Sequence, residues 1–291
     1  MKTDAELARL AARIVACRRC SRLVRHREAS AERPPRRYAG QTYWARPLPG
    51  FGDPGARLLL VGLAPAAHGG NRTGRMFTGD RSGDWLFDAL HHAGLANQPT
   101  SRHRTDGLRL RDAWITATLR CAPPANKPTP AEVAACQPYL LEELRLLSRV
   151  RVVVALGRIG WQAYLRARRA VGAARPVETP RFAHGAVTRF ADGVTLIASY
   201  HPSQQNTFTG KLTRPMLRGV FLKARRLLAA VGYRGTPRVP RGAPNAGGCG
   251  GPFRGPTRGQ SDRSAGRRGR SVTVRLSSRD WPSRTTVTLT R

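Results

Sequence analysis

Acidic residues are scarce in this sequence. Its 17 Asp and Glu stand against 51 Lys and Arg, which gives a formal net charge of +34 at pH 7. Such an excess points to a polyanionic partner, and nucleic acid is the leading candidate because Lys and Arg contacts to phosphate release bound counterions. A GC-rich genome, which favours Arg over Lys, is an alternative source for part of the excess, although it does not account for the shortage of acids.

Long apolar runs are missing as well. No stretch approaches the roughly 20 apolar residues of a membrane-spanning helix. The first residues, MKTDAELARL, lack the apolar core of a signal peptide. We therefore expect a cytoplasmic protein with no membrane partner. In that compartment, cysteines serve as metal ligands or free thiols more often than as disulfides.

Apolar strand patterns alternate with amphipathic helix patterns along most of the chain. Strands are expected at 57–63, 113–119 and 151–157, with a hairpin over 187–200, and helices at 3–19, 81–93, 129–147, 159–169 and 213–229. This alternation predicts an α/β fold, a mostly parallel four-stranded sheet flanked by helices in three layers. The Pro-, Gly- and Arg-rich residues 30–55 are expected to be irregular. Loops distant in sequence would then meet at one edge of the sheet.

Two of these helices carry capping signals at their starts. Thr3 followed by Glu6, and Thr129 followed by Glu132, match the capping-box pattern, and Pro130 suits a first helical position.

The composition changes near residue 234. From there to the end the chain holds 13 Arg, no Lys and two acids, and it is dense in Gly, Pro and Ser. Such a segment buries too little apolar area to offset its chain entropy. We therefore predict one folded domain over residues 1–233 and a disordered basic tail over 234–291. The tail is either a non-specific DNA arm or an unselected extension.

The segment from Gly62 to Asp80, GLAPAAHGGNRTGRMFTGD, is the most informative in the chain. It follows an apolar strand pattern and precedes a helix pattern, so it is expected at the carboxyl edge of the sheet, where α/β proteins bind ligands. Its five glycines allow the backbone to approach a ligand closely.

Four cysteines can converge in the predicted fold. Cys17 and Cys20 form a C-x-x-C pair after the first helix, Cys121 follows a strand, and Cys136 lies in the next helix. Four thiolates suggest either Zn²⁺ or an iron–sulfur cluster, and the spacing does not choose between them. Ordinary buried thiols at Cys121 and Cys136 are an equally good explanation of the spacing alone.

Three motifs together resemble the iron–sulfur uracil-DNA glycosylases, in particular their family-five, or type b, branch. They are the Gly62–Asp80 segment, RCAPPANKPTPAE at 120–132 and HPSQQNTFTGKLT at 201–213, and the resemblance covers residues 8 to 230. It implies a [4Fe–4S] cluster held by Cys17, Cys20, Cys121 and Cys136. It also implies a DNA-repair hydrolase that removes uracil, and other deaminated bases such as hypoxanthine, from double- and single-stranded DNA as a monomer.

Cleaving the bond between sugar and base requires a carboxylate near C1′, a donor to the leaving base and a flat surface that stacks it. Asp80, His201 and Phe77 are the candidates for these roles. Asp80 is alternatively the N-cap of the following helix, with Asp84 as the competing carboxylate, and Phe77 is alternatively a core residue.

Further residues are expected to contact the base. Asn126 is a candidate to read a Watson–Crick edge, although it also suits a turn, and Gly62, His68 and Asn71 are expected to line the base pocket. Related branches carry a polar residue directly after Gly62. Here that position is Leu63, which cannot orient water, so the task passes to Asp80.

The polar loop 203–209 carries one aromatic residue, Phe208, and suits a probe of the minor groove. DNA contacts are expected at Arg72, Arg75, Gln204, Lys211 and Arg214. Two rival functions are a non-catalytic nucleic-acid-binding protein with a structural metal and an iron–sulfur electron carrier. The basic, Gly-rich loop argues against the electron carrier.

Overall fold

The fold was examined in a computed structural model, which describes residues 2–232. The basic tail expected over 234–291 lies outside the described residues. Within residues 2–232, the helices are too short or too polar for any of them to cross a membrane.

A six-stranded sheet forms the centre of the fold, with strand order β1-β3-β2-β4-β6-β5. Its four inner strands, β3 (Ala113–Ala117), β2 (Leu58–Gly62), β4 (Val152–Leu156) and β6 (Thr195–Ser199), run parallel. Every residue of these four strands is buried, as expected for a sheet covered on both faces. The four expected strands are therefore confirmed as the parallel core.

The sheet is nevertheless wider than the four strands predicted. Two antiparallel edge strands extend it: β1 (Phe51–Gly52) beside β3, and β5 (Val187–Arg189), which forms the expected hairpin with β6. The prediction missed β1 because two residues show no alternation of apolar and polar side chains, and because they lie in the Pro- and Gly-rich segment.

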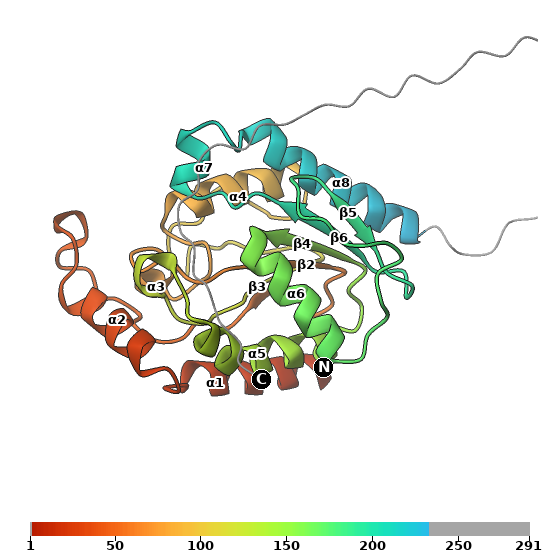
Figure 1. Cartoon of the computed structure of the whole chain (residues 1–291). Helices are drawn as coiled ribbons and strands as arrows, with labels where there is room; N and C mark the ends of the chain where they lie inside the picture. The colour runs from red at the N-terminus through yellow and green to blue at the C-terminus, as the bar shows by residue number, and fades with distance from the viewer. Residues whose placement is uncertain (1, 233–291) are drawn as a thin grey trace, which may run out of the picture. The chain divides into compact units, whose positions relative to one another are not determined.

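Helices cover both faces of the sheet (Figure 1). On one face lie α1 (Lys2–Val15), α5 (Pro130–Leu146) and α6 (Arg158–Ala170), and on the other lie α4 (Arg81–His92) and α8 (Arg214–Gly232). Alternate residues of β2 serve the two layers, because successive strand side chains point to opposite faces. Leu58 and Leu60 pack in the cluster that includes α4 and α8, whereas Leu59 and Val61 pack in the cluster with Tyr164 of α6.

The two capping predictions had different outcomes. At α5, the Glu132 N–H donates to Thr129 Oγ1 (3.2 Å) and the Thr129 N–H donates to Glu132 Oε2 (2.8 Å), so the capping box is confirmed. At α1 the prediction was wrong, because that helix already includes Lys2 and Thr3 lies inside it.

Helix α2 (Ser21–Glu32) was not predicted, although it occupies much of the segment before the sheet. Its inward face holds Leu23, Val24, Arg27 and Ser30, so two of four buried positions are polar. An apolar stripe, the usual sign of a packed helix, is absent from this face. Four short elements complete the structure: η1 (Arg36–Tyr38), α3 (Gly70–Thr73), η2 (Pro124–Asn126) and α7 (Gln204–Phe208).

Candidate active site

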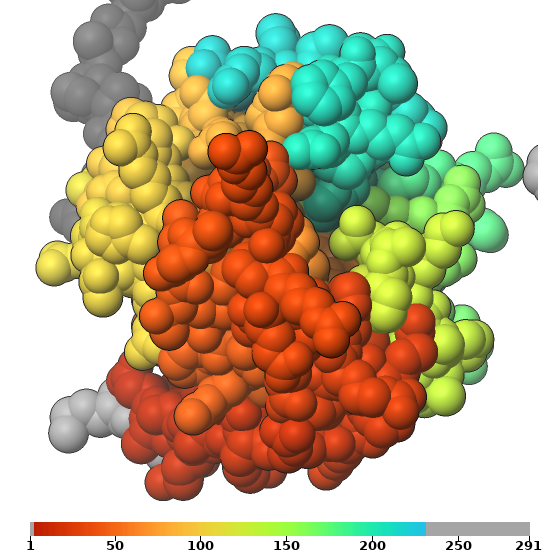
Figure 2. Space-filling model, turned by 90° about the vertical axis from the view of Figure 1, so that its left-hand side faces the viewer, coloured from red at the N-terminus to blue at the C-terminus, as the bar shows by residue number. Residues whose placement is uncertain are grey.

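The loops after β2, β3, β4 and β6 lie at one edge of the sheet because these strands are parallel. Backbone hydrogen bonds hold the loop starts together. The Thr118 N–H donates to the Gly62 carbonyl (2.9 Å), and the Gly157 N–H donates to the Ser199 carbonyl (2.8 Å). Figure 2 shows the face that these loops form, which is hollowed between the orange N-terminal segment, the yellow-green segment and the teal segment that holds α7.

Asp80 is the N-cap of α4, with Oδ1 accepting a hydrogen bond from the Gly83 N–H (2.9 Å). Its Oδ2 lies against Gly69, where a Cβ would collide with it. The loop therefore needs glycine at position 69 to admit the carboxyl group. Burial raises the pKa of Asp80, and the nearby Asp84 carboxylate raises it further, while backbone hydrogen bonds and Arg72 oppose the rise. Asp84 itself lies exposed in the first turn of α4.

His201 follows β6 and sits across from Phe77, with ring centroids 5.8 Å apart. Burial lowers the pKa of His201 to about 4, so the imidazole is neutral at pH 7 and carries one N–H donor. The His201 carbonyl accepts a hydrogen bond from Asn206 Nδ2 of α7 (2.9 Å), which fixes the backbone beside the ring. The structure thus brings His201 to the loop that carries Asp80.

Phe77 packs over the end of β2. A Cβ at Gly62 would lie 3.1 Å from Phe77 Cζ, so glycine leaves just enough room for the ring. Phe77 is buried, yet its backbone has φ of 53°, in the left-handed region that non-glycine residues rarely occupy. Such strain persists only where the surroundings enforce it, and it gathers at functional sites. The ring is both a core residue and a wall of this edge.

Asn126 also has a left-handed backbone, with φ of 56°, and it ends the exposed turn η2. The expected turn-forming role is therefore observed, and the side chain is exposed. Leu63 lies directly after β2, where its carbonyl accepts a hydrogen bond from the Leu119 N–H (2.9 Å). This places an apolar side chain at the carboxyl edge of the sheet.

His68 and Asn71 do not share one environment. The His68 ring contacts Tyr38 and Tyr43, and its Nδ1 forms a hydrogen bond with the Tyr43 hydroxyl (2.9 Å). Asn71 is 1% exposed, and its Nδ2 donates to the carbonyls of Arg27 (3.1 Å) and Ala67 (3.3 Å). Asn71 is thus a buried brace for the loop, and its Oδ1 has no hydrogen-bond partner within the described residues.

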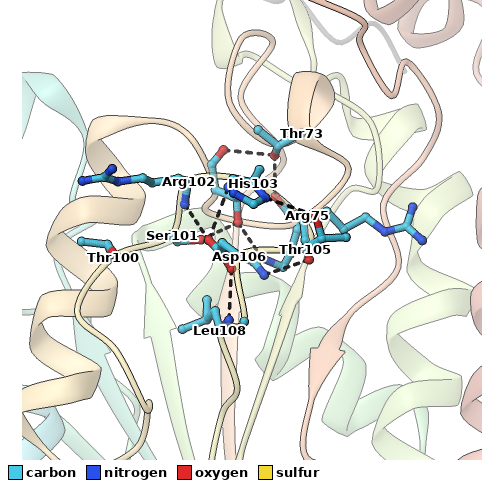
Figure 3. Close-up of polar contacts among 12 residues, drawn as sticks. Thr73, Arg75, Thr100, Ser101, Arg102, His103, Thr105, Asp106 and Leu108 are labelled. Atoms are coloured by element: carbon cyan, nitrogen blue, oxygen red, sulfur yellow. Dashed lines mark hydrogen bonds and ion pairs between the residues drawn. The ribbon is translucent and has the colours of Figure 1, made fainter.

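Arg75, which was expected to contact DNA, is buried, and internal groups engage its guanidinium. Figure 3 shows its guanidinium among the polar groups of the segment around Asp106. Nη2 contacts both carboxylate oxygens of Asp106 (2.8 Å each) and Ser101 Oγ (2.9 Å), and Nε donates to Thr78 Oγ1 (2.9 Å). Burial alone would raise the pKa of Asp106, but hydrogen bonds from Arg75 and the backbone lower it overall.

Arg72 is also engaged within the loop. Its Nε donates to the His68 carbonyl (2.9 Å), and Nη2 donates to the Gly79 carbonyl (2.8 Å), so it links the middle of the loop to its end. The guanidinium also stacks on the Tyr38 ring, with its central carbon 4.2 Å from the ring centroid. Most of its donors are used internally, which leaves less for phosphate than the sequence suggested.

The remaining expected DNA contacts lie on the outer surface. Gln204 is exposed on α7, and Lys211 is exposed with its Nζ 5.1 Å from the Tyr200 ring centroid. Arg214 at the start of α8 pairs with Asp88 (3.2 Å). Phe208 is 67% exposed, an uncommon state for a large apolar side chain, and the Arg81 guanidinium stacks on it.

The four cysteines converge as predicted. Cys17 follows α1, Cys20 is the N-cap of α2, Cys121 follows β3 and Cys136 lies in α5; all four are free thiols and line one small pocket. Burial raises the pKa of the Cys20 and Cys121 thiols, and that of Cys136 to about 12. Within the described part of the chain, no three Cys, His, Asp or Glu side chains are grouped closely enough to hold a single metal ion.

A separate cavity of about 860 Å³ lies between α1 and the segment around Trp44. Neither Asp80, His201 nor Phe77 lines it. The candidate carboxylate, imidazole and aromatic ring therefore lie at the carboxyl edge of the sheet and not in this larger cavity.

Comparison with known proteins places this fold and site in a family. Residues 49–225 match the uracil DNA glycosylase superfamily, so the chain belongs to that superfamily. A protein from Mycobacterium tuberculosis named type-5 uracil-DNA glycosylase is 54% identical over 222 residues, which cover 76% of this chain and 81% of the relative. A type-5 enzyme from Thermus thermophilus is 53% identical over 214 residues, 74% of this chain and 94% of the relative. Within the superfamily, the chain is a member of the type-5 branch.

A more distant relative carries the name of a different type of uracil-DNA glycosylase. A protein from Pyrobaculum aerophilum named type-4 uracil-DNA glycosylase is 32% identical over 186 residues, which cover 62% of this chain and 81% of the relative.

Proposed function

We propose that the chain is a monofunctional DNA-repair glycosylase that hydrolyses the bond between uracil and deoxyribose, leaving an abasic site. Hypoxanthine and other deaminated bases are proposed as further substrates, in double- or single-stranded DNA. The main support is that Asp80, His201 and Phe77 meet at one edge of the sheet in a chain of the type-5 branch. A monomer is expected to suffice, because all three groups come from one chain.

In the proposed reaction the target nucleotide is flipped out of the helix, and its base enters the edge beside Phe77. The base stacks on the Phe77 ring, which packs against Gly62 and lies near the His201 ring. As the bond to C1′ breaks, negative charge develops on the base. The neutral His201 imidazole donates its N–H to the base O2 and stabilises that charge without becoming protonated itself.

Asp80 serves the sugar side of the reaction. In its ionised form the carboxylate stabilises the positive charge that develops on the sugar, and it orients the water that attacks C1′. The N-cap hydrogen bond to Gly83 holds one oxygen in place, and the contact with Gly69 sets the direction of the other. Capping and catalysis are thus compatible duties of one side chain.

Asn126, on its exposed turn, is proposed to read the Watson–Crick edge of the base, with Gly62 and His68 completing the base-binding loop. Gln204, Lys211 and Arg214 are proposed to contact the DNA backbone, and Phe208 to fill the space that the flipped base leaves. Their exposure at the rim of the same edge supports these roles.

A [4Fe–4S] cluster bound by Cys17, Cys20, Cys121 and Cys136 is the proposed cofactor, and it would hold the segments on either side of the site in place. Four free thiols around one pocket form a suitable donor set. Each iron of such a cluster would take one thiolate, so the four cysteines around this pocket match the number of ligands that it requires.

The activity is tested by incubating the purified full chain with oligonucleotides that contain uracil or hypoxanthine, followed by alkali. We expect strand scission at the deaminated position. A non-catalytic nucleic-acid-binding protein would instead bind these oligonucleotides tightly, with strong salt dependence, and yield no scission. Absence of scission on both substrates would overturn the proposed activity.

A further inference from the structure

Arg27 is a buried cation whose ion pair with a carboxylate is long and partly exposed. Its side chain on α2 is 2% exposed. Among the described residues, its one ion pair is with Glu28, whose Oε1 lies 3.8 Å from Nη2 and whose side chain is itself 37% exposed. A charge removed from water is costly unless an opposite charge and hydrogen bonds compensate it.

Arg120 shows how this protein usually satisfies a buried arginine. It is 1% exposed, and its two terminal nitrogens contact the two carboxylate oxygens of Glu143, at 3.1 Å and 2.5 Å. This forked pair neutralises the charge and uses both terminal nitrogens. Arg120 Nε, like Arg27 Nε, has no hydrogen-bond partner within the described residues, so the two arginines differ in their counter-charge. Arg27 lies close by in space, beside the same cysteine pocket, and has no equivalent of Glu143 within residues 2–232.

The donors of Arg27 are directed toward the cysteines. Nη1 donates to Cys121 Sγ (3.1 Å) and lies 3.4 Å from the Cys17 carbonyl, while the buried Nε has no hydrogen-bond partner within the described residues. A neutral thiol is a weak acceptor, whereas a thiolate bound to a net-anionic cluster accepts strongly. Thiolates that hold a net-anionic cluster would therefore supply the negative charge that Arg27 lacks.

The backbone of Arg27 reaches the active-site loop. Its carbonyl accepts the hydrogen bond from Asn71 Nδ2 (3.1 Å), and Asn71 lies in the segment that leads to Asp80. Arg27 thus contacts a cysteine through its side chain and the loop through its main chain.

We propose that Arg27 is a positioning residue of the iron–sulfur centre: its buried guanidinium is the counter-charge of the cluster and the hydrogen-bond donor to the Cys121 thiolate. The proposal rests on the cofactor proposed above. Hydrogen bonds and positive charge near cluster sulfurs favour the reduced state and retain the metal.

The test compares three full-length proteins: wild type, Arg27→Gln and Arg25→Gln. Arg25 is an exposed residue of the same helix, so its variant removes an equal charge without touching a sulfur. Iron and sulfide content are measured first, then the reduction potential of the cluster and the rate of iron loss to a chelator. Arg27→Gln is expected to have a more negative potential and about tenfold faster iron loss, whereas Arg25→Gln matches wild type.

A further variant, Arg27→Lys, covers the case in which Arg27→Gln does not fold. It keeps the charge but not the fork, and we expect a potential between those of wild type and Arg27→Gln. Potentials and iron-loss rates equal to wild type in the Arg27 variants, at full iron content, would overturn the role of Arg27 and leave the cofactor intact. Wild-type protein that contains zinc, or neither iron nor sulfide, would overturn the cofactor itself and with it this role.

Discussion

The middle and the end of the loop from Gly62 to Asp80 differ in how fully their polar side chains are hydrogen-bonded within the protein. In the middle, Arg75 is enclosed by Asp106, Ser101 and Thr78, with every guanidinium nitrogen donating to an internal acceptor. At the end, the half-buried Asp80 carboxyl group accepts hydrogen bonds from backbone N–H groups and, among the described residues, from no cation, and the half-buried His201 ring makes no hydrogen bond with them. The middle therefore anchors the loop, while the end keeps groups whose hydrogen-bonding capacity is free for a substrate.

This contrast is what separates a structural from a catalytic polar group. A fully paired buried ion contributes shape, because moving it would break several bonds at once. The Asp80 carboxyl group and the neutral His201 imidazole are instead proposed to contribute chemistry, since partial burial has shifted the pKa of each away from its ordinary value. The following variants test the middle of the loop against its end.

Asp80→Asn is expected to have the largest effect on turnover. Asparagine caps a helix about as well as aspartate, so α4 and the thermal stability should be retained. The charge is lost, and we expect kcat to fall by about 100- to 10,000-fold while binding to uracil-containing DNA is kept. Single-turnover kinetics and a DNA-binding titration measure the two properties.

The control for this variant is Asp84→Asn, which removes an exposed carboxylate one turn further along the helix. Its turnover should stay close to wild type. If Asp84→Asn lost turnover and Asp80→Asn did not, the water-positioning role would belong to Asp84.

Arg75→Met should affect stability more than chemistry. It leaves Asp106 buried without its cation, and breaking such a pair from one side costs about 3–5 kcal/mol of unfolding free energy. Denaturant unfolding measures the loss. The double variant Arg75→Met with Asp106→Leu should recover part of it, since no charge is then left unpaired. A stable Arg75→Met protein with weakened DNA binding would restore the surface role predicted from sequence.

Gly69→Ala tests the contact between Gly69 and the Asp80 carboxyl group at the end of the loop. The added Cβ would collide with Asp80 Oδ2, so the carboxyl group must move. A displacement of about 1 Å at a reacting group can cost about 100-fold in rate, and we expect kcat to fall by that order with little change in DNA affinity. Unchanged kcat in Gly69→Ala would show that the position of Oδ2 is not critical.

The pH dependence of stability gives the smallest expected effect. The pKa of His201 is lowered in the folded state from 6.5 to about 4, so between these values the unfolded chain binds more protons. Stability from this group is complete above pH 6.5 and is lost as the pH falls toward 4, by on the order of 2 kcal/mol given partial exposure. His201→Asn should flatten this part of the curve in denaturant unfolding. An unchanged slope would mean that His201 is not held neutral by burial.

The sequence predicted elements best where the pattern of side chains is uniform. The four inner strands are apolar throughout and were found within two residues of their ends, and the Thr129 capping box was found in full. Helix α2 was missed because Arg27 and Ser30 interrupt its buried face. The apolar pattern that marks a packed helix is absent where a helix packs against cysteines and polar groups.

For the candidate site, the sequence gives the chemical type of each residue but not its burial or its contacts. His201 and Phe77 lie with their ring centroids 5.8 Å apart, and Asp80 ends the loop that carries Phe77, because the parallel strands bring their loops to one edge. Arg75 and Asn71 were placed by residue type on the DNA and base surfaces, and both are buried. Nothing in the sequence distinguishes Gly69 from the other four glycines of the loop, whereas the structure places it against Asp80 Oδ2.

The sequence by itself therefore determined the α/β order of elements, the family and the set of residues capable of the chemistry, since these depend on residue type and local spacing. Only the tertiary structure decided which arginines are internal. Burial depends on partners far along the chain: Asp106 is 31 residues from Arg75, and Cys121 is 94 residues from Arg27. A local sequence pattern does not reveal such long-range pairings. These pairings determine whether an arginine is used inside the protein or stays available for a contact with DNA.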